Sequence, residues 1–154
     1  MSSTRLEVLR AVVQLIQLAL SGVEVVGPDD EESRTRRVDA VGICIVGAGD
    51  PGEPEVDLGI LTYWYDHAIP IELTVTRTSG RSAEDQIDEM LGQIGAAIAA
   101  DRTLGGLCIW MEPTAATTSD VIVLNADRDV PGGRPPRGAD FALVATYGSP
   151  SPLT

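Results

Sequence analysis

The chain of 154 residues contains no lysine, and this absence removes several kinds of chemistry at once. There is no phosphate-loop lysine for a nucleotide, no Schiff-base lysine and no lysine general base. All 11 basic residues are arginines, set against 23 acidic residues, so the net charge is −12. Proteins that bind nucleic acid on an outer surface rely on cations that neutralise phosphates. The composition therefore argues against that role, although it suits a channel through which DNA slides without adhering.

Cysteine and histidine are also scarce. Cys44 and Cys108 lie far apart in the sequence, in neither a zinc-ligand nor a redox Cys-x-x-Cys spacing, so buried, reduced thiols are expected. His67 is the only histidine, no Gly-x-Ser-x-Gly motif is present, and the acids form no calcium-loop pattern. Glu72 and Glu112 lie near apolar runs without a second catalytic partner. We predict no catalytic residue, no metal ligand and no cofactor, and we expect His67 to be a hydrogen-bonded structural residue.

Long apolar runs are absent as well. None approaches the ~18 residues needed to span a membrane, and the length fits one domain over residues 1–154. The apolar residues 11–20 follow two arginines, as in a secretion signal, but Glu7, Gln14 and Gln17 interrupt that pattern. We therefore expect neither a membrane span nor a secretion signal.

Two helices are predicted. Residues 4–7 (TRLE) form a capping-box pattern, and the apolar positions that follow predict a helix from Arg5 to Leu20 that is mostly buried. Residues 82–85 (SAED) form the capped start of a second helix, predicted from Ala83 to Ala100. Its apolar residues recur at helical spacing, namely Ile87, Met90, Leu91, Ile94 and Ile98.

Short apolar or alternating runs predict the strands. They cover residues 23–26, 41–46, 107–111, 121–124 and 141–147, with 58–65 and 71–77 forming a hairpin or long meander. The tail 148–154 is expected to be loose unless an interface captures it. The elements together predict an α/β (α+β) fold, in which a mostly antiparallel sheet packs against two main helices.

Residues 47–52 (GAGDPG) match the dinucleotide-binding pattern Gly-x-Gly-x-x-Gly. In such a site the third glycine opens a helix whose N-terminus holds the pyrophosphate. Here Pro51 and Pro54 lead into a strand-like segment instead. We interpret the motif as a glycine-rich turn.

Two arginine-bearing loops and a row of aromatic residues are candidates for contacts. In residues 29–37 four acids precede three arginines, which is typical of a solvated loop or of a contact between copies of the chain. The loop 127–137 is rich in proline, glycine and arginine, so it is either mobile or ordered by a partner. Large aromatics either anchor interfaces or complete a core. The candidate interface residues are Trp64, Tyr65, Arg34, Arg36, Arg37 and Arg128.

Three segments of the chain resemble small tail-region proteins of proteobacterial prophages and gene transfer agents. They are residues 50–58 (DPGEPEVDL), 61–67 (LTYWYDH) and 94–108 (IGAAIAADRTLGGLC). Proteins of this kind are often labelled acyl-CoA transferases. They are similar in size and element order to the tail terminators of long-tailed phages, which form a hexameric ring at the head-proximal end of the tail tube. The resemblance covers most of residues 40–147.

The resemblance implies a structural virion protein, a homohexamer with one face for the tail tube protein and one for the head-tail connector or neck. DNA would pass through its lumen without specific binding. The implied location is the neck end of the virion tail, after assembly in the host cytoplasm.

Two alternatives stay open. A head-tail connector or another tail subunit would also form rings. An acyl-CoA transferase-type enzyme is the second alternative, although coenzyme A transferases are chains of several hundred residues and no catalytic carboxylate motif is visible here.

Overall fold

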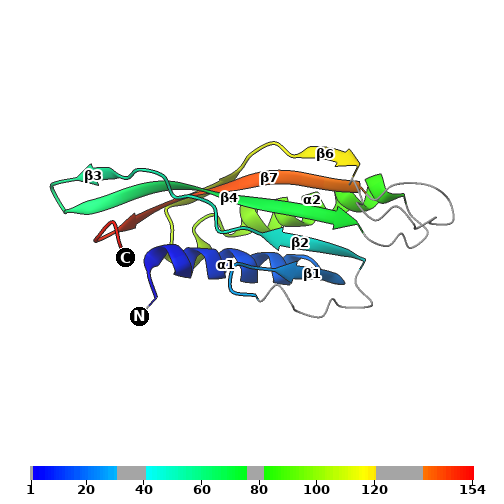
Figure 1. The fold of residues 1–154 in the computed structure, drawn as a ribbon, viewed down its shortest axis with the longest axis horizontal. Coiled ribbons are helices and arrows are strands. Elements are labelled where there is room, and N and C mark those ends of the chain that lie inside the picture. Colours follow the sequence, from blue (N-terminus) through cyan, green and yellow to red (C-terminus); the bar gives the residue numbers. More distant parts are fainter. Residues whose placement is uncertain (1, 31–40, 76–81, 121–136) are drawn as a thin grey trace.

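The computed structural model describes residues 2–30, 41–75, 82–120 and 137–154. It has an α+β fold, as predicted, in which two helices pack against a seven-stranded sheet. Figure 1 shows that both helices and the two longest strands run along the long axis of the molecule. The elements are α1 (Thr4–Ala19), β1 (Val23–Val26), β2 (Gly42–Val46), β3 (Glu55–Asp57), β4 (Thr62–Val75), α2 (Ala83–Ala100), the 3₁₀ helix η1 (Leu104–Gly106), β5 (Trp110–Pro113), β6 (Thr117–Asp120) and β7 (Arg137–Ser149).

The centre of the sheet is the long antiparallel pair formed by β4 and β7, which stay in register from Tyr63↔Ser149 to Thr74↔Gly138. The strand order is β1-β2-β4-β7-β5, with β3 paired to β4 and β6 paired to β7. β1 and β2 are parallel, and every other pair is antiparallel. The expectation of a mostly antiparallel sheet is confirmed.

Both long strands bury alternate side chains on one face of the sheet. This is the face against which the buried residues of the two helices pack, and each fully buried Ile or Leu there contributes roughly 1.5–3 kcal/mol. The intervening positions, such as Asp66 and Glu72 of β4, are exposed. The sheet therefore has one face in the core and one face that the described helices leave open.

The two helices begin with serine caps. Ser3 Oγ accepts a hydrogen bond from the Leu6 amide at 3.2 Å, so the N-cap of α1 is one residue earlier than the predicted capping box. The buried residues of α1 lie along one side only, and Leu18 is 82% exposed, so the expectation that most of this helix is buried is wrong there. The bounds of α2 are those predicted, with Ser82 Oγ accepting from the Asp85 amide at 3.1 Å.

β4 is one uninterrupted strand, and this corrects the predicted hairpin or meander over residues 58–65 and 71–75. The turn lies earlier, at residues 58–61, and it joins β3 to β4. Pro70 is tolerated inside the strand because its partner Ala142 directs its backbone amide and carbonyl to Thr114, away from β4. The missing N–H of Pro70 therefore costs no hydrogen bond between β4 and β7.

Most other strand predictions are confirmed, with shifted bounds. β1 matches residues 23–26, β2 begins one residue later than predicted, and β7 extends the predicted strand 141–147 at both ends. The strand predicted at 107–111 begins only at Trp110, and β6 was not predicted. The strand predicted at 121–124 lies outside the described residues, as do residues 76 and 77 of the predicted strand 71–77.

The C-terminal tail is held by the chain itself. The amide of Thr4 donates to the carbonyl oxygen of Thr154 at 3.2 Å, and Ser149 Oγ lies 2.7 Å from the same oxygen. The expectation of a loose tail is therefore wrong for this structure. In the part of the chain that the structure describes, no helix is long and apolar enough to cross a membrane.

Candidate functional site

An arm projects beyond the helices at one end of the molecule (Figure 1). We define the arm as residues 55–64 with their β7 partners 148–149. Its turn is closed by Asp57 Oδ1, which accepts from the Gly59 amide at 2.9 Å, and Leu61 adopts a positive φ of 45°. This geometry turns aliphatic side chains out towards solvent. The exposed fractions are 47% for Val56, 82% for Leu58, 70% for Ile60 and 55% for Leu61.

An open groove of about 450 Å³ lies beside the arm tip, which we define as residues 58–61. Three segments that are distant in sequence form it, namely 60–64 of the arm, 106–109 before β5, and 148–150 at the end of β7. None of the described residues that line the groove is charged. Its lining residues are Ile60, Leu61, Thr62, Trp64, Gly106, Leu107, Cys108, Ile109, Gly148, Ser149 and Pro150.

Two of the predicted interface residues, Trp64 and Tyr65, lie on opposite faces of β4. Trp64 is half-buried and lines the groove, where its ring lies close to Gly148. Tyr65 is buried on the core face, with its ring 5.7 Å from that of Tyr147 and its hydroxyl donating to the Pro152 carbonyl at 3.4 Å. Adjacent strand residues point to opposite faces, so one surface cannot present both side chains.

The predicted interface arginines Arg34, Arg36, Arg37 and Arg128 lie outside the described residues. So do residues 31–37 of the mixed-charge run and residues 127–136 of the second loop. Arg137, the last residue of that loop, begins β7, and its Nε donates to Glu84 Oε2 at 2.7 Å.

A surface cluster at β5 was not foreseen. The Arg102 guanidinium lies 4.9 Å from the centre of the Trp110 ring and donates to the Met111 carbonyl at 2.8 Å. Glu112 Oε2 accepts from Arg102 at 3.0 Å and from Trp110 Nε1 at 2.9 Å. The Arg102 side chain is 29% exposed and that of Glu112 is 61% exposed, so solvent screens the ion pair and we expect it to contribute at most about 1 kcal/mol.

His67 is fully buried, and both of its ring nitrogens are hydrogen-bonded. Nε2 lies 2.7 Å from the Ala48 carbonyl, which can only accept, so Nε2 carries the proton. In the neutral ring Nδ1 then accepts from the Tyr147 hydroxyl at 3.0 Å. Burial lowers the pKa of His67 and outweighs the bond to Ala48, which acts to raise it. This is the environment expected of a structural histidine, because no nitrogen is free to move a substrate proton.

The cysteines are buried, as expected. Burial raises the pKa of the Cys44 thiol to about 12 and also raises the pKa of Cys108. A nucleophilic cysteine needs the opposite shift. Within the described ranges, no group of three or more His, Cys, Asp or Glu residues could hold a metal ion.

The glycine motif at residues 47–52 is a turn, as interpreted from the sequence. Gly49 has a φ of +64°, Asp50 pairs with Ala68, and Asp50 Oδ1 accepts from the Gly52 amide at 2.9 Å. The chain then enters β3 rather than a helix, so the motif provides no helix N-terminus for a pyrophosphate.

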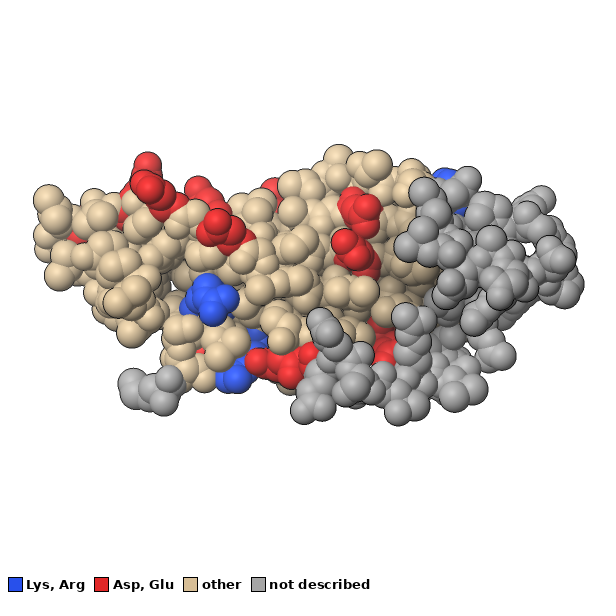
Figure 2. Space-filling view, viewed as in Figure 1, with Lys and Arg blue, Asp and Glu red and all other residues tan. Residues whose placement is uncertain are grey.

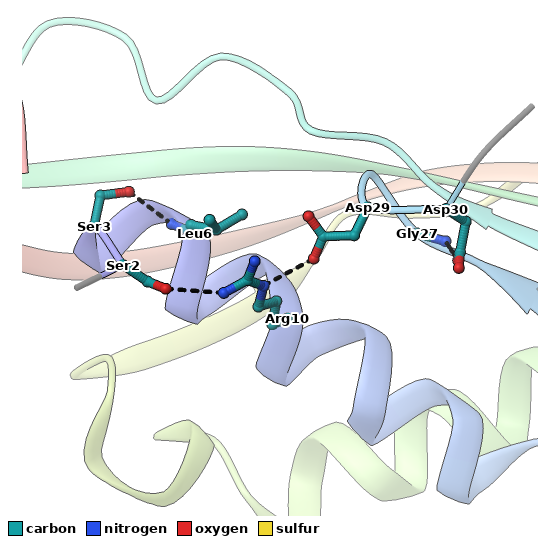
Figure 3. Close-up of polar contacts among 7 residues, drawn as sticks. All are labelled: Ser2, Ser3, Leu6, Arg10, Gly27, Asp29 and Asp30. Atoms are coloured by element: carbon teal, nitrogen blue, oxygen red, sulfur yellow. Dashed lines mark hydrogen bonds and ion pairs between the residues drawn. The ribbon is translucent and has the colours of Figure 1, made fainter.

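Two other cavities carry charged side chains. One of about 320 Å³ lies between the start of α1, the C-terminal tail and residues 51–54, and its lining includes Arg5 and Glu53. The other, of about 370 Å³, follows α1, and its lining includes Arg10, Asp29 and Asp30. Figure 3 shows Arg10 held between Ser2 Oγ and Asp29 Oδ2, each at 2.8 Å.

The groove beside the arm was not predicted from the sequence. Its one signal in the sequence is the turn Leu58-Gly59-Ile60-Leu61, since a surface turn with three aliphatic residues is unusual. Comparison of the sequence with models of protein families gives no match, and comparison with curated proteins gives none either.

Proposed function

We propose that this chain is a structural virion subunit, a tail terminator that assembles into a hexameric ring. The ring sits on the head-proximal end of the tail tube and joins it to the neck or connector. The observation that carries the proposal is the arm, whose aliphatic tip is exposed where a monomer would gain by burying it.

Two further features support the proposal. The α+β architecture, with a mostly antiparallel sheet backed by two helices, is the one implied by the resemblance of residues 50–58, 61–67 and 94–108 to tail-region proteins. Moreover, both cysteines and His67 are buried, and the two ring nitrogens of His67 are hydrogen-bonded within the chain. A role in assembly would make use of the exposed aliphatic arm tip.

The mechanism follows from symmetry. Tube subunits present a stacking surface to the next ring, and growth continues while that surface is renewed. A closed ring that binds the tube on one face and lacks the stacking surface on its other face stops growth. The far face is then free to dock on the connector. An acidic subunit suits this position, because DNA that passes through the ring meets few cations that would retain it.

The test is to measure the mass of the purified protein by native mass spectrometry and to image it with and without tail tubes by negative-stain microscopy. Hexameric rings, or rings on one end of each tube, are the expected result. Rings that bind connectors and ignore tube ends would indicate a connector instead. A stable monomer that ignores tubes, shows a thermal shift with coenzyme A and cleaves acyl-CoA thioesters would contradict the proposal in favour of an enzyme.

A further inference from the structure

We propose that the arm tip of one copy of this chain inserts into the uncharged groove of a second copy. The inference rests on the proposed function, since it names the contact by which the ring assembles. It places Leu58 against Leu107 and Ile109 of the next subunit.

The arm tip exposes apolar side chains that a partner could bury. The three aliphatic residues of this turn are each more than half exposed, and Leu58 at 82% is held out from the body by the closed turn. In Figure 2 the arm, found at the left as in Figure 1, shows mainly uncharged atoms with acidic groups along its upper edge and no basic group. Contiguous exposed apolar surface of this kind marks an interaction site.

Like the arm tip, the groove has no charged side chain among the described residues that line it. A groove that receives a charged segment carries opposite charges on its walls. The cavity at the start of α1 includes Arg5 and Glu53, and the one along α1 includes Arg10 and two aspartates. The groove beside the arm has apolar, small and hydroxyl side chains and no described charge. Its fitting occupant is an uncharged aliphatic side chain. Leu58 is such a side chain and does not line the groove of its own copy, whereas Ile60 and Leu61 do.

Because of its net charge, two copies of the chain can approach each other most easily through uncharged surfaces. Two copies with a net charge of −12 repel each other wherever their acidic surfaces approach. The repulsion is smallest where both surfaces are uncharged, and the arm tip and the groove meet that condition. Leu58 does not line the groove of its own copy, so a contact between Leu58 of one copy and the groove of the next leaves a free Leu58 and a free groove at the two ends. Such a contact propagates and can close into a ring.

The experiment compares three variants at equal concentration by analytical ultracentrifugation and native mass spectrometry. Leu58→Asp places a charge on the tip, and Ile109→Asp, at a residue that is 58% exposed, places a charge in the groove. Leu18→Asp is the matched control, since Leu18 is as exposed as Leu58 but lies near the end of α1. We expect the first two variants to be folded monomers by circular dichroism and the third to assemble like the wild type.

A mixture of the Leu58→Asp and Ile109→Asp proteins provides the decisive test. The Leu58→Asp protein keeps an intact groove and the Ile109→Asp protein keeps an intact tip, so a one-to-one mixture is expected to form heterodimers that stop at two chains. Wild-type assembly is also expected to strengthen with added salt, because salt screens the repulsion between like charges. Wild-type assembly by either single variant, or a mixture that stays monomeric, would overturn the inference.

Adding tail tubes separates this inference from the proposed function. If Leu58→Asp still forms rings and those rings no longer cap tubes, the tip contacts the tube rather than a second copy, and only the inference fails. If the wild type neither forms rings nor binds tubes, both fail.

Discussion

The hydroxyl of Tyr147 donates a hydrogen bond to Nδ1 of His67 across 3.0 Å, where neither side chain meets solvent. Burial raises the pKa of Tyr147 to about 12 and lowers the pKa of His67 from its ordinary value of 6.5. The pair therefore joins β4 to β7 as two neutral groups. A neutral donor and acceptor contribute more here than a charged ring would, because a buried charge must be desolvated.

The neutral state of His67 predicts a loss of stability in acid. The unfolded chain binds a proton below pH 6.5, whereas the folded chain resists it, so the stabilisation is complete above pH 6.5 and falls as the pH drops towards the folded pKa. The free energy of unfolding of the wild type should decline faster between pH 7.5 and pH 5 than that of His67→Gln. The difference in slope is at most about 1.4 kcal/mol per pH unit. Urea titrations at several pH values measure it, and parallel slopes would show that His67 does not titrate on unfolding.

Gly49 and Gly52 offer a matched pair of substitutions. Both have positive φ angles, but a Cβ at Gly49 would lie 2.2 Å from the Ala68 carbonyl oxygen, whereas a Cβ at Gly52 meets nothing within 4 Å. Gly52→Ala should lower the free energy of unfolding by about 1 kcal/mol, the cost of the left-handed backbone. Gly49→Ala should cost about 3 kcal/mol or more, since β4 must also move. Equal losses in chemical denaturation would mean that the approach of the turn to β4 is not tight.

A second pair of substitutions tests which residue caps the N-terminus of α1. Ser3→Ala removes the oxygen that accepts from the Leu6 amide and should cost about 1 kcal/mol. Thr4→Ala leaves the backbone bond from Thr4 to Thr154 in place, so its effect should stay within about 0.5 kcal/mol. Thermal denaturation of the two variants distinguishes the assignments, and the opposite order would restore the capping box predicted from residues 4–7.

These predictions reflect which parts of the fold follow from local sequence. The bounds of α2 could be predicted because a serine cap and an apolar stripe at helical spacing agree with each other. The unbroken β4 could not, because Pro70 ordinarily ends a strand, and only its pairing with Ala142 makes its missing N–H harmless. The cap at Ser3 was missed because Thr4 also offers a hydroxyl and is followed three residues later by Glu7.

The candidate site could likewise be predicted only in part from local sequence. Trp64 could be selected from the sequence as a candidate contact residue, but the alternation that buries Tyr65 depends on which face of β4 meets the helices. The groove joins residues 60–64 to 106–109 and 148–150, and no local pattern brings these segments together. Tertiary pairing of β4 with β7 and the loop before β5 create it.

The thiols should be unreactive in the folded protein. Cys44 is fully buried with a pKa of about 12, and Cys108 is nearly buried and donates to the Arg102 carbonyl at 3.6 Å. A disulfide-exchange reagent at pH 8 is expected to modify neither cysteine in buffer and both in guanidinium chloride. Rapid modification of Cys108 in buffer would show that its thiol can be reached from the groove.

Trp64 provides the last prediction, because it lines the groove while Trp110 does not. Trp64→Ala removes a large half-buried ring from the surface that we propose receives the arm tip, and aromatic anchors of this kind dominate interface energies. We expect the concentration needed for half-maximal assembly to rise at least about tenfold. Trp110→Ala is the control, since this ring is half-exposed and stacks on Arg102 outside the groove. Sedimentation equilibrium of both variants, with folding monitored by circular dichroism, provides the measurement. If Trp64→Ala assembles at the same concentration as the wild type, Trp64 only completes the packing against Gly148 and has no role in assembly.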